Sequence, residues 1–122
     1  MMTWLLVACG GAIGASLRYG LGIFLAKPQS LFPWSTWWIN LLGCALAGVF
    51  FALSQKYPNL QNEARLFFMV GVLGGFTTFS SFGLETLQLL KQGQFVIALT
   101  YALSSVILGV SVLALMVYLL QR

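Results

Sequence analysis

Long runs of apolar residues constrain this chain more than any other feature of its sequence. A helix needs roughly 20 apolar residues to cross the ~30 Å hydrocarbon core of a bilayer. Four stretches meet that length, at residues 3–26, 34–54, 66–90 and 95–120. Hydrophobic residues make up 60% of the chain and charged residues only 7%, a composition that is far outside the usual range for soluble domains. The sequence predicts an all-α membrane protein whose four transmembrane helices form a single domain, residues 1–122.

The connections between these spans are short and polar. They read KPQSLFP, QKYPNLQNEAR and KQGQ. Short connections favour antiparallel neighbouring helices, so we expect a bundle with both chain ends on one side of the membrane. Trp34, Trp37 and Trp38 begin the second span, where indole rings are typical of the membrane interface.

Positive charges are divided almost evenly between the two sides of the membrane. The side with the chain ends carries Lys56, Arg65 and Arg122, and the other side carries Lys27 and Lys91. Such residues normally set orientation because they stay in the cytoplasm. A bias of three to two either fixes one orientation or lets the chain insert both ways up. In the second case two opposed copies could pair as an antiparallel homodimer.

Several function classes have no residues to support them. The net charge of +4 is scattered, without the basic patch that nucleic acid binding requires. The chain has no His, and Cys9 and Cys44 lack the spacing of metal ligands, so we interpret both as small core residues. No nucleophile, general base or catalytic metal set is visible. We therefore predict no catalytic residue and no enzyme.

Polar side chains inside the spans are costly in lipid and usually face a partner or a water-filled path. Arg18 lies in the first span, although its long side chain could instead reach the interface. Asn40 lies in the second span, where an interhelical hydrogen bond would also explain it. Both residues are candidates for a functional site.

The third and fourth spans each carry a polar stripe. At 100° per residue, one narrow stripe of the third span contains Thr78, Ser81, Glu85 and Gln88, bordered by Phe79 and Phe82. The fourth span aligns Thr100, Ser104 and Ser111, with Tyr101 and Ser105 beside them. Two such stripes predict a narrow hydrogen-bonding track through an apolar bundle, with core packing as the alternative.

A glycine pair, Gly74 and Gly75, precedes the hydroxyl-rich part of the third span. Paired glycines followed by hydroxyl residues favour unwinding, and a broken helix exposes backbone carbonyls that lipid cannot satisfy. Carbonyls at that depth would suit a hard cation such as sodium. An intact helix with two packing glycines is the alternative.

Taken together, these motifs closely resemble those of the CrcB or Fluc family of small fluoride channels. The resemblance rests on GGAIGASLRYG, WWINLLG, GGFTTFSSF followed by GLE, and ALTYALSSV, in that order over essentially the whole chain. Phe76 stands where the family commonly has Leu, and Ser81 where it commonly has Thr. Both changes leave the aromatic spacing and a hydroxyl in place.

The resemblance implies an antiparallel, dual-topology homodimer in the bacterial inner membrane that exports toxic fluoride by passive permeation. It implies a structural sodium ion at the dimer interface, bound by the backbone carbonyls of Gly74 and Thr77. Arg18 would lie toward the aqueous vestibule. The implied fluoride pathway consists of Asn40, Phe79, Phe82, Ser80, Ser81, Glu85, Tyr101 and Ser105.

The main rival function is a small dual-topology exporter of cationic drugs. Such proteins have a similar length and charge balance, but they depend on a carboxylate in the first span. Here the first span carries Arg18, and the only embedded acid, Glu85, lies in the third.

Overall fold

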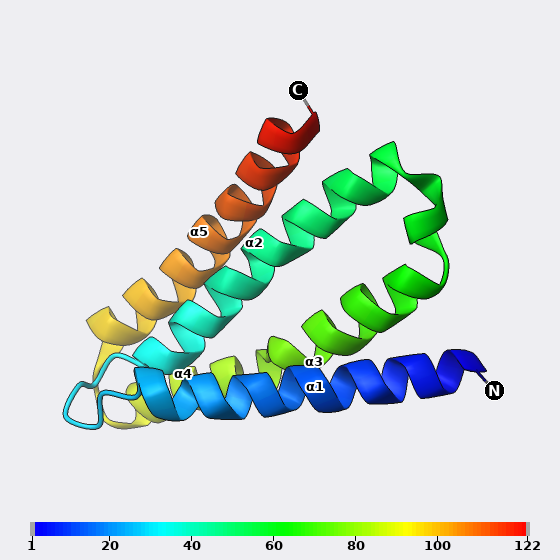
Figure 1. Ribbon diagram of the computed structural model, residues 1–122. Coiled ribbons are helices and arrows are strands. Elements are labelled where there is room, and N and C mark those ends of the chain that lie inside the picture. Colours follow the sequence, from blue (N-terminus) through cyan, green and yellow to red (C-terminus); the bar gives the residue numbers. More distant parts are fainter. Residues whose placement is uncertain (1, 122) are drawn as a thin grey trace.

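The computed structural model describes residues 2–121, which fold into helices joined by short connections (Figure 1). The elements are α1 (Met2–Leu25), α2 (Trp34–Lys56), the 3₁₀ turn η1 (Pro58–Gln61), the π-helix η2 (Arg65–Leu73), α3 (Gly74–Phe76), α4 (Phe79–Lys91) and α5 (Phe95–Gln121). Four stretches are long and apolar enough to cross a membrane: Met2–Leu25, Trp34–Lys56, Arg65–Lys91 and Phe95–Gln121. The prediction of four apolar helices is confirmed. Arg122, which was counted among the charges, lies outside the described residues.

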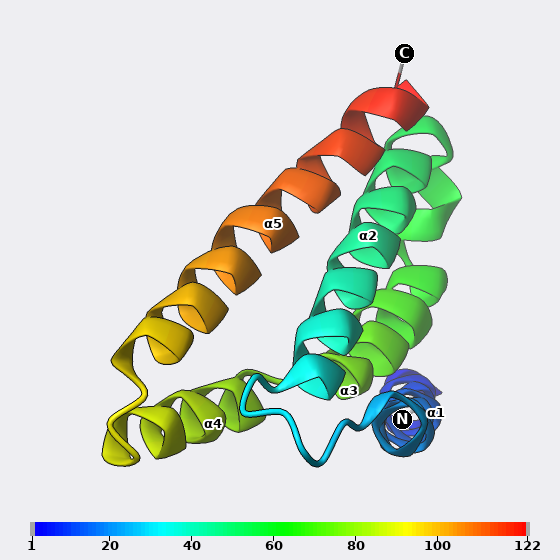
Figure 2. The same cartoon turned by 90° about the vertical axis from the view of Figure 1, so that its left-hand side faces the viewer.

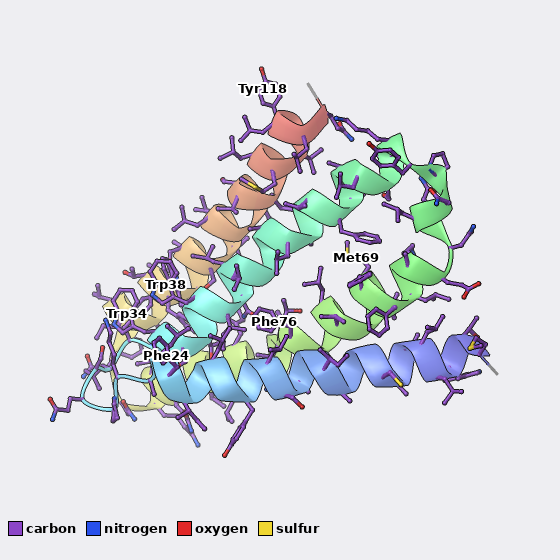
Figure 3. The ribbon with its side chains drawn as sticks, in the orientation of Figure 1. Phe24, Trp34, Trp38, Met69, Phe76 and Tyr118 are labelled. Atoms are coloured by element: carbon purple, nitrogen blue, oxygen red, sulfur yellow. The ribbon has the colours of Figure 1, made fainter. Side chains whose placement is uncertain are left out.

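The helices pack as two layers that share the third span. α2 runs beside α5, whereas α1 lies along η2 and α3, and α4 packs against α5 (Figures 1 and 2). The connections 26–33 and 92–94 lie at the same end of the molecule. Both chain ends and the 57–64 connection lie away from that end. Met69 and Phe76 project from the third span toward α2 (Figure 3).

Glycines allow α1 to approach the third span closely. A Cβ atom on Gly14 would collide with the backbone carbonyl of Val72, and one on Gly75 would come within 2.6 Å of the Gly11 carbonyl oxygen. Because these obstacles are backbone atoms, no side-chain rotation could relieve the clash. The contact therefore depends on residues without a side chain.

The glycine pair of the third span is helical, contrary to the unwinding expected there. Gly74 has φ −62° and ψ −38°, and Gly75 lies within α3. The extended residues come just after them, Thr77 at φ −84° and ψ 157° and Thr78 at φ −146° and ψ 122°. Packing against α1 explains why Gly75 stays helical.

The cysteines differ in their surroundings. Cys44 is half-buried on α2, but Cys9 is exposed on α1. The interpretation of Cys9 as a core residue is wrong for the single chain, because its face of α1 has no neighbouring helix.

Candidate functional site

A cavity of about 450 Å³ lies where α2, the third span and α5 meet. Six of the residues predicted from the sequence line it: Asn40, Gly74, Thr77, Phe79, Phe82 and Ser105. Thr78, Gly43 and Cys44 contribute to the same wall. The structure thus brings together residues that are up to 65 positions apart, from Asn40 to Ser105.

Asn40 holds the extended part of the third span. Its Nδ2 donates to the Thr78 carbonyl oxygen at 3.1 Å, and its Oδ1 accepts from the Thr78 N–H at 3.0 Å. The side-chain amide replaces hydrogen bonds that non-helical backbone would otherwise lack inside the membrane. An amide nitrogen has two N–H groups, so one remains for a ligand in the cavity.

Thr78 also begins α4. Its Oγ1 accepts a hydrogen bond from the Ser81 N–H at 3.1 Å, which makes it the N-cap. The N-terminus of a helix presents partial positive charge from its unpaired N–H groups. This end of α4 adjoins the cavity, where it favours negative charge.

Two backbone carbonyls at the end of α3 have no donor. Within residues 2–121, no hydrogen bond reaches the oxygen of Gly74 or Thr77. The neighbouring Gly75 carbonyl differs, because it accepts from Arg18 Nε at 3.1 Å. The Thr77 hydroxyl donates to Leu73 O at 3.0 Å, and its methyl occupies the space that a Cβ on Gly43 would need. Two unpaired, uncharged oxygens are a donor set that fits a hard cation such as sodium.

The phenyl pair Phe79 and Phe82 lines the cavity from α4. The ring centroids of Phe79 and Phe82 lie 5.8 Å apart, and Phe82 lies 5.1 Å from Tyr101. Phe79 is 83% exposed in the single chain, although it borders the cavity. A phenyl ring is positive at its edge, so it can face an anion there.

Ser105 carries the one buried side-chain oxygen without a hydrogen-bond partner among the described residues. Its residue lines the cavity with Asn40 and both phenylalanines. Leaving a buried hydroxyl unpaired costs about 1–3 kcal/mol. Such a group is expected to have a ligand or water as its partner.

Glu85 forms a separate cluster next to this cavity. Tyr101 Oη donates to Glu85 Oε1 at 3.0 Å, and Thr36 Oγ1 donates to Oε2 at 3.1 Å. Tyr101 is completely buried. Each carboxylate oxygen therefore accepts one hydrogen bond, and these bonds connect α4 to α2 and α5.

Besides Glu85 and Tyr101, three further predicted residues do not line the cavity. Ser80 is exposed, with its hydroxyl 3.4 Å from that of Thr78. Ser81 is half-buried and contacts Thr78 through its backbone N–H. Arg18 binds the Gly75 carbonyl from α1 and does not line the cavity.

Thr36 and Trp37 were not predicted as site residues. Thr36 lies one turn before Asn40, so its i, i+4 spacing was the signal that could have found it. Trp37 looked interfacial, but its indole Nε1 donates to Ser104 Oγ at 2.9 Å. Trp34 and Trp38 do lie at the loop end of the molecule (Figure 3).

Four apolar spans, with a largely apolar cavity that carries a few polar groups at an interrupted helix, define a small multi-pass membrane protein of the channel or transporter class. The profile of one family, described as "CrcB-like protein, Camphor Resistance (CrcB)", matches residues 5–117. The chain belongs to this CrcB family.

Curated relatives extend over nearly the whole chain. It is 53% identical to the Fluoride-specific ion channel FluC of a Thermus thermophilus strain, over 89% of this chain and 87% of the relative. It is 45% identical to the protein of that name from Hyphomonas neptunium, over 100% and 98%. For Phocaeicola vulgatus the identity is 44%, over 90% and 91%. The family is one of channels, not enzymes, and the chain is a multi-pass protein of the bacterial plasma membrane.

Proposed function

We propose that this protein is a fluoride-selective ion channel that exports toxic fluoride by passive permeation. The unpaired Ser105 hydroxyl carries the proposal, because it is buried and its residue lines the same cavity as Asn40 and the phenyl pair. The curated relatives, which are named as fluoride channels, support the same substrate.

Selectivity follows from the donors that face the cavity. Fluoride is small and strongly hydrated, so a pore must replace its water with short-range donors. The free Asn40 N–H, the Ser105 hydroxyl and the ring edges of Phe79 and Phe82 provide them without a full positive charge. Uncharged donors bind the ion weakly enough to release it. In this proposal Glu85, Tyr101, Ser80 and Ser81 would extend the track beyond the cavity, and Arg18 would lie toward the vestibule.

The working unit in this proposal is an antiparallel homodimer of dual topology. The exposed Phe79 ring and the unpaired Gly74 and Thr77 carbonyls leave the cavity incomplete in one chain. A second, inverted copy would cover them and supply the other half of the interface. C-terminal reporters that appear on only one side of the membrane would rule out dual topology.

The carbonyls of Gly74 and Thr77 would hold a structural sodium ion at this interface. A fixed cation there would offset part of the cost of placing an anion in a low-dielectric region. Elemental analysis that finds no sodium in purified, dialysed protein would remove this part of the proposal.

The function is tested by ion release from liposomes that contain the purified protein. Fluoride efflux, followed with a fluoride electrode, should far exceed that from empty vesicles, while chloride efflux should stay at the empty-vesicle level. Equal fluoride release with and without protein would refute the proposal.

A further inference from the structure

A second cavity, of about 240 Å³, lies beside Glu85 toward the loop end of the molecule. Its wall consists of Ser30, Leu31, Pro33, Glu85, Gln88, Leu89 and Gln92. The wall therefore combines residues of the 26–33 connection with residues from the C-terminal half of α4. Of these residues, only Glu85 has a role in the proposed pathway.

The two cavities follow one another along the same face of α4. Glu85, Gln88 and Gln92 have i, i+3 and i+7 spacing, which places them on one stripe of the helix. Phe82 borders the first cavity and packs on Tyr101, whose hydroxyl binds Glu85. Glu85 in turn borders the second cavity. Side-chain contacts through Phe82, Tyr101 and Glu85 therefore run from the first cavity to the second, although the two cavities share no lining residue.

The second cavity is lined by uncharged hydrogen-bond donors that have no partner among the described residues. Among residues 2–121, the side-chain amides of Gln88 and Gln92 make no hydrogen bond. Each amide has two N–H donors and one oxygen acceptor, so it can bind both an anion and water. Lys91 in the last turn of α4 offsets the negative end of the helix.

Glu85 does not close this cavity to an anion. Its two oxygens accept hydrogen bonds from Thr36 on α2 and Tyr101 on α5, which offset part of their negative charge. The charge that remains opposes tight binding, which suits a place from which an ion must leave.

We propose that this second cavity is an outlet of the channel, in which fluoride exchanges protein donors for water and the amides of Gln88 and Gln92 contact the partly hydrated ion. The inference rests on the proposed function. It adds to the pathway a site at the mouth of the pore, formed by α4 and the 26–33 connection.

Thiol modification tests the outlet in protein that has already folded. In a background with Cys9→Ala and Cys44→Ala, single Gln88→Cys and Gln92→Cys variants are reconstituted and treated on both sides with a bulky, water-soluble methanethiosulfonate. Leu90→Cys is the matched control, because it is exposed and lies on roughly the opposite side of the helix from both glutamines.

Modification at Gln88→Cys or Gln92→Cys should reduce fluoride efflux by about tenfold or more, as expected for a group that obstructs a narrow pore. Modification at Leu90→Cys should leave it unchanged. Thiols at positions 88 and 92 that do not react, or that react without loss of efflux, would overturn the inference, as would equal loss at Leu90→Cys. If neither the unmodified background variant nor the natural protein releases fluoride, the result would instead refute the proposed function.

Discussion

Asn40 shows how one side chain can fix a stretch of backbone that is not helical. The side-chain amide of Asn40 pairs with both the backbone N–H and the backbone carbonyl of Thr78, at 3.0 and 3.1 Å. Without the amide, these groups would be buried in an apolar surrounding. The Asn40 amide therefore positions the extended threonines and also presents a donor to the cavity.

Replacing Asn40 by Leu should abolish most fluoride efflux. The variant keeps a similar volume but leaves the Thr78 N–H and carbonyl unpaired, at a cost of about 1–3 kcal/mol for each group. Ser111→Ala, which removes an exposed hydroxyl from α5, is the control and should keep full efflux. Asn40→Leu protein that releases fluoride at the natural rate would contradict the assigned role of the amide.

A motif or a period in the sequence selected individual residues, and the fold brings several of them to one cavity. Asn40, Phe79, Phe82 and Ser105 were all predicted as pathway residues, and all four line the cavity. Thr36 was missed because a hydroxyl near the end of a span has many uses. Only the fold shows that Thr36 faces Glu85 from a position 49 residues away.

Among the elements, the contact between α1 and the third span has the tightest steric limits. Gly14 faces the backbone of Val72, so even a methyl group does not fit. Gly20 lies on the same helix but has no atom within 4 Å of where its Cβ would be. Substitutions at these two glycines therefore distinguish the effect of helix packing, at Gly14, from the effect of helix propensity alone, at Gly20.

Gly14→Ala should lower the thermal stability of the purified protein, and Gly20→Ala should not. Overpacking at Gly14 costs about 1–3 kcal/mol, whereas Ala at an open helical position gains up to about 1 kcal/mol over Gly. Thermal unfolding in the same detergent compares the two variants. If Gly14→Ala unfolds at or above the temperature of the natural protein, the close contact is misassigned.

The location of the extended segment could not be read from the sequence. Glycine has little preference for helix, so the pair Gly74 and Gly75 was the natural candidate for unwinding. Two tertiary contacts decide otherwise: α1 packs on Gly75, and Asn40 binds Thr78. Neither contact leaves a signal in the local pattern around the glycines. The four spans were predictable because length and apolar content alone determine them.

For the molecule as a whole, the cavity on the third span is the feature that joins fold and function. It combines the free Asn40 N–H, the unpaired Ser105 hydroxyl and two phenyl rings at the N-terminal end of α4. Phe79 contributes to this cavity although most of its surface is exposed in the single chain. Its replacement therefore removes little intramolecular packing.

The central claim, that fluoride crosses the membrane through this cavity, is tested most directly by comparing fluoride efflux from Phe79→Ile and Phe24→Ile proteins in liposomes. The two rings are matched in exposure, 83% for Phe79 and 82% for Phe24, but only Phe79 borders the cavity. We expect Phe79→Ile to slow fluoride release by about tenfold or more, because an aliphatic side chain has no positive ring edge, and Phe24→Ile to match the natural protein. Equal release rates from the two variants would contradict the account.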